Sequence, residues 1–182
     1  MYSTDLVFRL WDPALWIASD DTVRGGRSFS NLTIAPDTAT FSGFLDKDSL
    51  GGAGFASQRT KGSLDWDLAE WDGLLLSVAL SDGKLYTLTV KDVLPENDTD
   101  SSLLYERNFT LPAGAGEGVK LSWSGFVPTL RGRTQPDAKP LDTSSIKRLS
   151  IMMRSYFGEQ EGLFNLTLNS IGAFRSPGTG YA

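Results

Sequence analysis

Apolar and polar residues alternate in short runs along this sequence, and this period of two constrains the fold more than any other feature. In residues 85–91, apolar side chains take every second position, and the positions between them hold Thr87, Thr89 and Lys91. Such alternation is typical of a β-strand with one buried face. Turn residues separate nine such runs, which predict strands at 28–34, 38–45, 54–58, 73–80, 85–91, 104–110, 119–123, 147–154 and 163–169.

The expected fold class is all-β, an antiparallel β-sandwich or jelly roll, because many short strands occur without a long amphipathic helix. One short helical turn is predicted at 12–17. The dipeptide Asp82-Gly83 lies between the runs 73–80 and 85–91. Asp-Gly between two alternating runs predicts that the flanking strands pair as a hairpin.

The chain has 182 residues, and we predict one domain over residues 1–176 and a frayed tail over 177–182. The loop 128–142 carries three prolines, and a loop of this length in a compact domain is either functional or floppy.

The net charge of -5 argues against a nucleic-acid-binding surface, which needs clustered Lys and Arg. The apolar stretch 6–17 is too short and too interrupted to span a membrane. No targeting signal is recognised, so the cytoplasm is the default compartment.

The sequence contains neither cysteine nor histidine, and this excludes several chemistries. Disulfides, thiolate nucleophiles and thiolate metal sites need cysteine. A Ser-His-Asp triad, an imidazole base and an ordinary zinc site need histidine. Acid–base chemistry would fall to Asp, Glu, Lys or Tyr, and no metal site or cofactor is predicted.

Two glycine-rich stretches, 25–26 and 51–54, invite comparison with phosphate-binding loops. A phosphate loop requires a following helix, and neither stretch precedes a helical pattern. We therefore predict turns or bulges with positive φ beside strands.

Asp20 and Asp21 form an adjacent pair of carboxylates shortly before Arg24. Adjacent carboxylates can shift each other's pKa and divide into an acid and a base. The favoured alternative is a carboxylate paired with Arg24 or Arg27 that pins a turn.

Arginines recur at the ends of predicted strands, and they leave two interpretations open. They could present a face that binds carboxylate or phosphate groups, or they could form internal salt bridges. Trp123 belongs either to the core or to a sugar-binding platform. The candidate ligand-binding residues are Arg59, Thr89, Lys91, Trp123, Arg131 and Arg154.

Several short motifs, in this order and spacing, resemble the complex I intermediate-associated protein 30 family: 19–28, 41–44, 51–59, 71–74, 82–86, 123–126, 129–133, 157–162, 164–166 and Ile171. The resemblance implies a galactose-binding-like β-sandwich, similar in fold to carbohydrate-binding modules. It also implies structural roles for the signature residues Asp21, Arg24, Gly25, Gly26, Gly52 and Gly54. Named relatives assist assembly of mitochondrial complex I without known catalysis. Because no transit peptide is visible, a mitochondrial location is expected only for a trimmed mature form.

Three functions follow as hypotheses. The first is a non-catalytic protein-binding module with an assembly or chaperone-like role and a protein partner, and it expects an exposed apolar patch outside the core. The second is a small-molecule or carbohydrate binder on the concave sheet face. The third is an isomerase or cyclase that acts on a metabolite through an Arg/Asp pocket, and it is favoured less than a function without catalysis.

Overall fold

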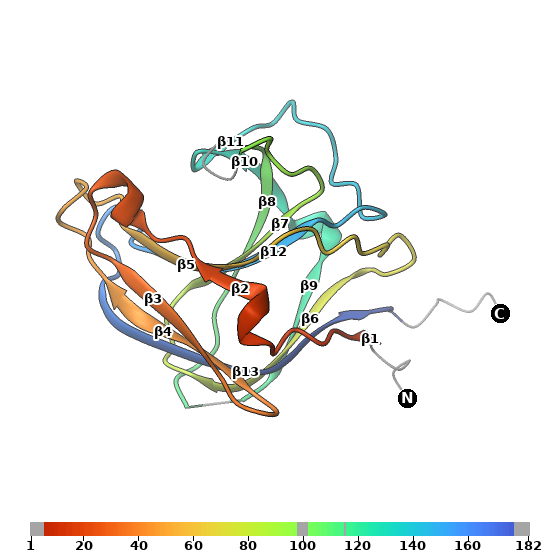
Figure 1. Cartoon of the computed structure of the whole chain (residues 1–182), viewed down its shortest axis with the longest axis horizontal. Helices are drawn as coiled ribbons and strands as arrows, with labels where there is room; N and C mark the ends of the chain where they lie inside the picture. The colour runs from red at the N-terminus through yellow and green to blue at the C-terminus, as the bar shows by residue number, and fades with distance from the viewer. Residues whose placement is uncertain (1–5, 98–101, 115, 177–182) are drawn as a thin grey trace.

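The computed structural model describes residues 6–97, 102–114 and 116–176, and it forms two antiparallel sheets that face each other (Figure 1). Sheet A contains, in spatial order, β3 (Phe29–Ile34), β4 (Ala39–Leu45), β13 (Gly162–Phe174), β6 (Gly73–Ser81) and β9 (Gly118–Ser122), with β1 (Leu6–Val7) beside β13. Sheet B contains β11 (Arg133–Thr134), β10 (Val127–Leu130), β8 (Leu104–Phe109), β7 (Tyr86–Lys91), β12 (Arg148–Arg154), β5 (Phe55–Thr60) and β2 (Trp16–Ala18). The all-β sandwich prediction is confirmed.

Helical structure in the described residues is limited to three 3₁₀ turns: η1 (Pro13–Leu15), η2 (Asp21–Arg24) and η3 (Trp123–Gly125). The turn η1 lies inside the predicted helical turn at 12–17. Its start is explained by Asp12, whose Oδ1 accepts a hydrogen bond from the backbone N–H of Ala14 at 2.8 Å. None of the helices in the described ranges has the length and apolar character needed to cross a membrane.

The core lies between the two sheets and is filled by the inward side chains that the alternation identified. Leu76 on β6, Leu88 on β7 and Ile151 on β12 are all completely buried. Each of the nine predicted strands corresponds to a strand of the structure, although β13 continues to Phe174. The strands β1, β2, β10 and β11 were not predicted, and β10 and β11 show that the segment 128–142 begins as a hairpin. The predicted tail at 177–182 lies outside the described residues.

The predicted hairpin between 73–80 and 85–91 is wrong, although both strands exist. The strand β6 pairs with β13 and β9 in sheet A, whereas β7 pairs with β12 and β8 in sheet B. The Asp82-Gly83 turn therefore carries the chain from one sheet to the other. Asp82 stabilises this turn, because its Oδ1 accepts hydrogen bonds from Lys84 N and Tyr86 Oη, each at 3.0 Å.

Candidate functional site

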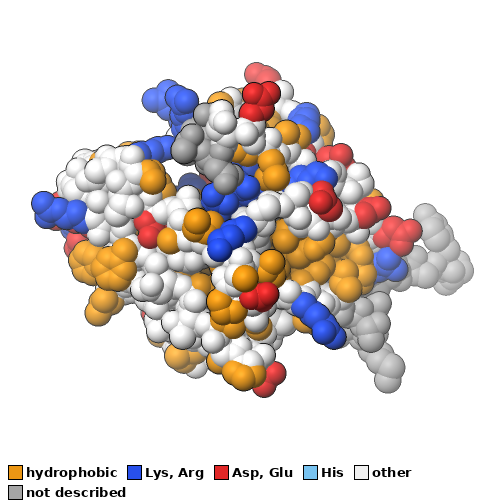
Figure 2. Space-filling model, viewed as in Figure 1, with side chains coloured by type: hydrophobic (Ala, Val, Ile, Leu, Met, Phe, Trp, Pro, Cys, Tyr) orange, Lys and Arg blue, Asp and Glu red, His pale blue; other side chains and the backbone are white. Residues whose placement is uncertain are grey.

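The outer face of sheet B gathers polar and charged side chains from four neighbouring strands. The registers align Arg59 on β5 with Ser150 on β12, Thr89 on β7 and Glu106 on β8. In Figure 1, β10 and β11 rise at one edge of this face. Figure 2 shows Lys and Arg side chains gathered across the upper half of the same view. This face carries most of the candidate residues that the sequence assigned to a concave sheet face.

The structure brings four of the six candidate ligand-binding residues together on this face: Arg59, Thr89, Lys91 and Arg154. The other two lie elsewhere. Trp123 belongs to η3, where its Nε1 donates a hydrogen bond to Trp71 O at 2.7 Å and its ring lies 5.4 Å from that of Phe126. Arg131 lies in the turn between β10 and β11 with a φ of 51°.

Internal contacts occupy much of this polar layer. The guanidinium of Arg154 pairs with both oxygens of Glu106, and the Nη1–Oε1 distance is 3.2 Å. The side chains of Arg154 and Glu106 are 20% and 13% exposed, so the pair is largely shielded from water. The ammonium of Lys91 donates to Ser102 Oγ at 2.6 Å. The arginine at the end of β12 thus takes part in an internal salt bridge, one of the two interpretations that the sequence left open.

Tyr156 and Phe157 are functional candidates that the sequence did not single out. Both are non-glycine residues with positive φ, 47° and 58°, which is uncommon and costly for aromatic residues. The Tyr156 hydroxyl lies 3.0 Å from Thr87 Oγ1 and 3.0 Å from Asn108 Oδ1, so its side chain reaches across the outer face of sheet B. Phe157 is 83% exposed.

Asp20 and Asp21 join the two sheets at one edge of the sandwich. Asp20 accepts hydrogen bonds from Ser30 N at 3.0 Å, Ser30 Oγ at 2.6 Å and Ser57 N at 2.8 Å. Asp21 accepts from Ser28 N and Phe55 N, both at 3.0 Å. Ser30 belongs to β3 in sheet A, whereas Ser57 and Phe55 belong to β5 in sheet B.

The carboxylates therefore pin a turn as predicted, but their hydrogen-bond partners are backbone N–H groups and the Ser30 hydroxyl rather than Arg24 or Arg27. The Arg24 guanidinium instead lies 5.6 Å from the centroid of the Phe55 ring. Both carboxylates are buried and accept hydrogen bonds on both oxygens, which supports a role in holding the fold.

The signature glycines occupy positions where a side chain would collide with its neighbours or where the backbone has a positive φ. A Cβ on Gly26 would lie 2.2 Å from Cγ of Asp21, and one on Gly54 would lie 1.8 Å from the backbone oxygen of Asp46. Gly25 and Gly52 have φ values of 82° and 92°, as predicted for turns with positive φ. Gly26 and Gly54 thus adjoin the Asp21 carboxylate, and Gly25 and Gly52 form turns with positive φ.

Every resolved pKa shift moves a group away from neutral pH. Hydrogen bonds from Ser49 and Ser144 lower the pKa of Asp46 and Asp142. Burial raises the pKa of Tyr86 and Tyr105. Acid–base catalysis near pH 7 requires shifts in the opposite direction. In the described ranges, Asp and Glu side chains form no group of three or more that could hold a metal ion.

The outer face of sheet A carries an exposed apolar row that we call the Phe44 row, formed by Phe29, Phe44 and Leu163. The register places Phe29 and Leu163 on either side of Phe44. Their side chains are 48%, 39% and 76% exposed, and the two phenylalanine rings lie 6.4 Å apart. Sequence reasoning missed this row, although each residue is an apolar residue at an outward position of a predicted strand.

A groove of about 470 Å³ runs beside the Phe44 row. Asn31, Ser42 and Asn165 form the next row across the same three strands. Asp82 and Lys84, from the turn between β6 and β7, complete the lining. This surface combines an apolar strip with a polar border, which is the composition of protein interfaces.

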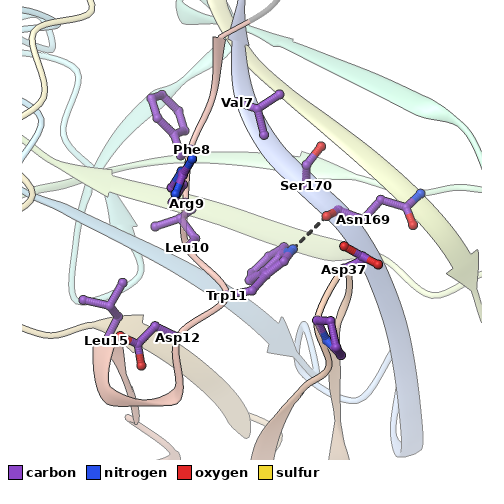
Figure 3. A pocket seen from close by; sticks show the side chains of 11 residues that line it. Val7, Phe8, Arg9, Leu10, Trp11, Asp12, Leu15, Asp37, Asn169 and Ser170 are labelled. Atoms are coloured by element: carbon purple, nitrogen blue, oxygen red, sulfur yellow. Dashed lines mark hydrogen bonds between the residues drawn. The ribbon is translucent and has the colours of Figure 1, made fainter.

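A second hollow, of about 460 Å³, lies where residues 7–15 cross β13 (Figure 3). Trp11 forms part of its wall, and its Nε1 donates to Asn169 O at 2.7 Å. Arg9 and Asp37 line the same hollow. The Trp11 contact holds the N-terminal segment against β13, so we assign Trp11 a packing role at this hollow.

Comparison with known proteins agrees with this architecture. Residues 8–168 match the family described as Complex I intermediate-associated protein 30 (CIA30). The chain is 43% identical over 173 residues to "Uncharacterized protein C9E9.15" of Schizosaccharomyces pombe, which covers 90% of this chain and 79% of that protein.

Among solved structures, the family 11 carbohydrate-binding module of the cellulase Lic26A-Cel5E of Clostridium thermocellum superposes with a TM-score of 0.67, 13% identity and 100% coverage of both chains. The same organism's family 11 module in complex with a β-1,3-1,4-mixed-linked tetrasaccharide gives a TM-score of 0.66 at 14% identity, and covers 94% of this chain and 95% of that one. At these identities the likeness concerns the fold. By the match over nearly its whole length, the chain belongs to the complex I intermediate-associated protein 30 family.

Proposed function

We propose that this protein is a non-catalytic protein-binding module that docks a partner on the Phe44 row. The observation that carries this proposal is the exposure of three large apolar side chains at adjacent register positions on three strands. Contiguous exposed apolar patches mark interaction sites, whereas single exposed apolar residues are ordinary. Membership of a family described by its association with complex I supports an assembly or chaperone-like role. The cytoplasm is the proposed compartment.

Covering this row would supply part of the binding free energy of a specific contact. Fully burying a Leu or Phe side chain is worth about 1.5–3 kcal/mol. Because Phe29 and Phe44 are already half buried and Leu163 is 76% exposed, covering all three would contribute about 3–4 kcal/mol. That contribution corresponds to an affinity gain of several hundredfold, roughly.

Affinity capture from the protein's own cells tests the proposal. The tagged chain is compared with the double variant Phe44→Ser/Leu163→Ser and with Val7→Ser/Val93→Ser as a matched control. Val7 is 58% exposed and Val93 is 55% exposed, and neither belongs to the row. We expect mass spectrometry to identify a partner that is retained by the wild type and the control and lost from the row variant. A partner retained equally by all three would refute the row as the docking site.

A second candidate function is a carbohydrate or small-molecule binder on the outer face of sheet B. It is favoured by the gathering of Arg59, Thr89, Lys91 and Arg154 on one face, and by the fold shared with a module solved in complex with a tetrasaccharide. Isothermal titration with a β-1,3-1,4-mixed-linked tetrasaccharide tests it. Heat of binding that disappears in Arg154→Ala, with the fold intact, would support this function. Absence of heat in the wild type would exclude this ligand.

A further inference from the structure

We infer that Tyr156 and Asn108 form a subsite for one neutral sugar unit on the outer face of sheet B, and that the strained backbone at Tyr156 places the tyrosine there. This inference rests on the second candidate function, and it specifies which residues orient the ligand and what charge the ligand carries. Three observations support it: an exposed donor beside an exposed acceptor, a neighbouring ion pair without net charge, and a turn whose own hydrogen bonds do not use the tyrosine side chain.

The Tyr156–Asn108 contact leaves one donor and one acceptor facing solvent. Asn108 Oδ1 accepts hydrogen bonds from Thr87 Oγ1 at 2.8 Å and from the Tyr156 hydroxyl at 3.0 Å. The NH₂ group of Asn108 donates to no residue of the described chain, and the Tyr156 oxygen keeps a lone pair. Asn108 is exposed and Tyr156 is partly exposed, whereas Thr87 is completely buried. The two groups that can meet a ligand are therefore the Asn108 NH₂ and the Tyr156 oxygen.

This pair of groups is complementary to the hydroxyls of a sugar. A hydroxyl both donates and accepts hydrogen bonds, so neighbouring hydroxyls of one sugar ring can accept from the Asn108 NH₂ and donate to the Tyr156 oxygen. The ring of Tyr156 adds apolar area directly beside its polar end. A sugar ring carries C–H groups beside its hydroxyls in the same way, which is why we assign a sugar unit to this subsite.

The charges next to the subsite favour an uncharged ligand. Glu106 lies two residues before Asn108 on the same face of β8. The Arg154 guanidinium pairs with both oxygens of Glu106, so this neighbouring pair carries no net charge. Lys91 lies about 13 Å along β7 from the position opposite Asn108, and Arg59 is on β5, which β12 separates from β7. An acidic group on the bound sugar unit would therefore meet the Glu106 carboxylate as well as the guanidinium.

The backbone strain at Tyr156 serves the position of its side chain. Its φ of 47° is costly for a residue with a Cβ. The turn itself is held by Ser155 O, which accepts from the N–H groups of residues 158–160, and by the Gln160 carboxamide, which pairs with Leu85 N and O. None of these bonds uses the Tyr156 side chain, and glycine would adopt the same φ without strain. What the tyrosine adds is the hydroxyl and the ring on the outer face of sheet B.

An array of neutral and uronic-acid-containing oligosaccharides, probed with the full chain, tests the inference. We expect the wild type to bind neutral oligosaccharides and to bind the uronic forms more weakly. The neutral oligosaccharide that binds most tightly is then titrated against Tyr156→Phe and Asn108→Ala, with Asn169→Ala, an exposed asparagine on sheet A, as the control. Each subsite variant should weaken binding about fivefold, because one hydrogen bond is lost, and the control should bind as the wild type does.

Tyr156→Gly separates ligand binding from support of the fold. Because glycine relieves the strain, thermal unfolding should give a Tm within about 4 °C of the wild type. Binding should weaken at least about tenfold, because the ring and the hydroxyl are both lost. A larger fall in Tm would show that the tyrosine supports the fold, and it would overturn the assignment of the strain to ligand binding.

The outcomes separate this inference from the proposed functions. If the wild type binds no oligosaccharide, the inference and the second candidate function both fall. If the wild type binds and both subsite variants bind equally well, the second candidate function stands and the subsite is refuted. Tighter binding of the uronic forms would refute the neutral ligand. Partner capture on the Phe44 row is a separate measurement, because that row lies on sheet A.

Discussion

Replacing Asp21 by Asn tests the claim that buried carboxylates hold the two sheets together. In the wild type, Oδ1 accepts from Ser28 N and Oδ2 accepts from Phe55 N, each at 3.0 Å, and the side chain is completely buried. Asparagine keeps one acceptor oxygen but places an NH₂ group where the second oxygen stood. One backbone N–H would then face another donor without access to water.

The magnitude follows from these two contacts. A hydrogen bond to a charged group contributes about 1.5–3 kcal/mol, and a buried donor left without an acceptor costs about 1–3 kcal/mol. Because the two effects overlap at one N–H, we expect Asp21→Asn to lower the free energy of unfolding by about 3 kcal/mol. For a domain of this size, that loss corresponds to a decrease in Tm of about 6–12 °C.

Urea denaturation followed by tryptophan fluorescence measures the effect. Asp37→Asn is the matched control, because it removes the same charge from an exposed turn between β3 and β4. The control should change stability by less than about 0.5 kcal/mol. A loss below that level in Asp21→Asn would refute the structural role that we assign to this carboxylate.

Three further predictions address other elements. Gly54→Ala should lower the free energy of unfolding by about 3 kcal/mol in urea denaturation, because its Cβ would lie 1.8 Å from Asp46 O; an unchanged midpoint would contradict this. Phe157→Asn should raise stability by about 1 kcal/mol in the same assay, because asparagine tolerates positive φ and the ring is exposed; a loss would contradict it. Hydrogen bonds, chiefly from Lys147, hold the pKa of Asp65 below its usual 3.8. The stabilisation from the Asp65–Lys147 pair is therefore fully present above pH 3.8 and is lost as the pH falls through the lowered pKa of the folded state. Carboxyl NMR titration should show this pKa rising in Lys147→Met, and an unchanged value would contradict the assignment.

The period-two alternation predicted strands and inner faces well, but it could not determine pairing. The runs 73–80 and 85–91 have the same pattern whether their apolar faces lie side by side in one sheet or meet across a core. Asp82 stabilises the Asp82-Gly83 turn through Lys84 and Tyr86. These contacts lie within residues 82–86, so they do not depend on whether the flanking strands pair with each other. Only contacts distant in sequence, such as those of β6 with β13, decide between them.

The period-two alternation also made part of the candidate site predictable, because it identifies the outward positions of each strand. Thr89 and Lys91 share a face with Arg59 and Arg154 because outward positions of neighbouring strands come together. The Phe44 row could not be predicted, since a single exposed apolar residue carries no signal and only the register across three strands makes a row. Similarly, the sequence indicated that Asp21 pins a turn, but its backbone partners depend on the meeting of β3 and β5 at the edge of the sandwich.

Photo-crosslinking in living cells tests the central claim most directly. The amino acid p-benzoylphenylalanine replaces Leu163 in one strain and Val93 in another, and both positions are exposed. We predict that irradiation produces a discrete covalent adduct with a protein partner from position 163 and none from position 93. No adduct at position 163, or the same adduct from both positions, would contradict docking on the Phe44 row.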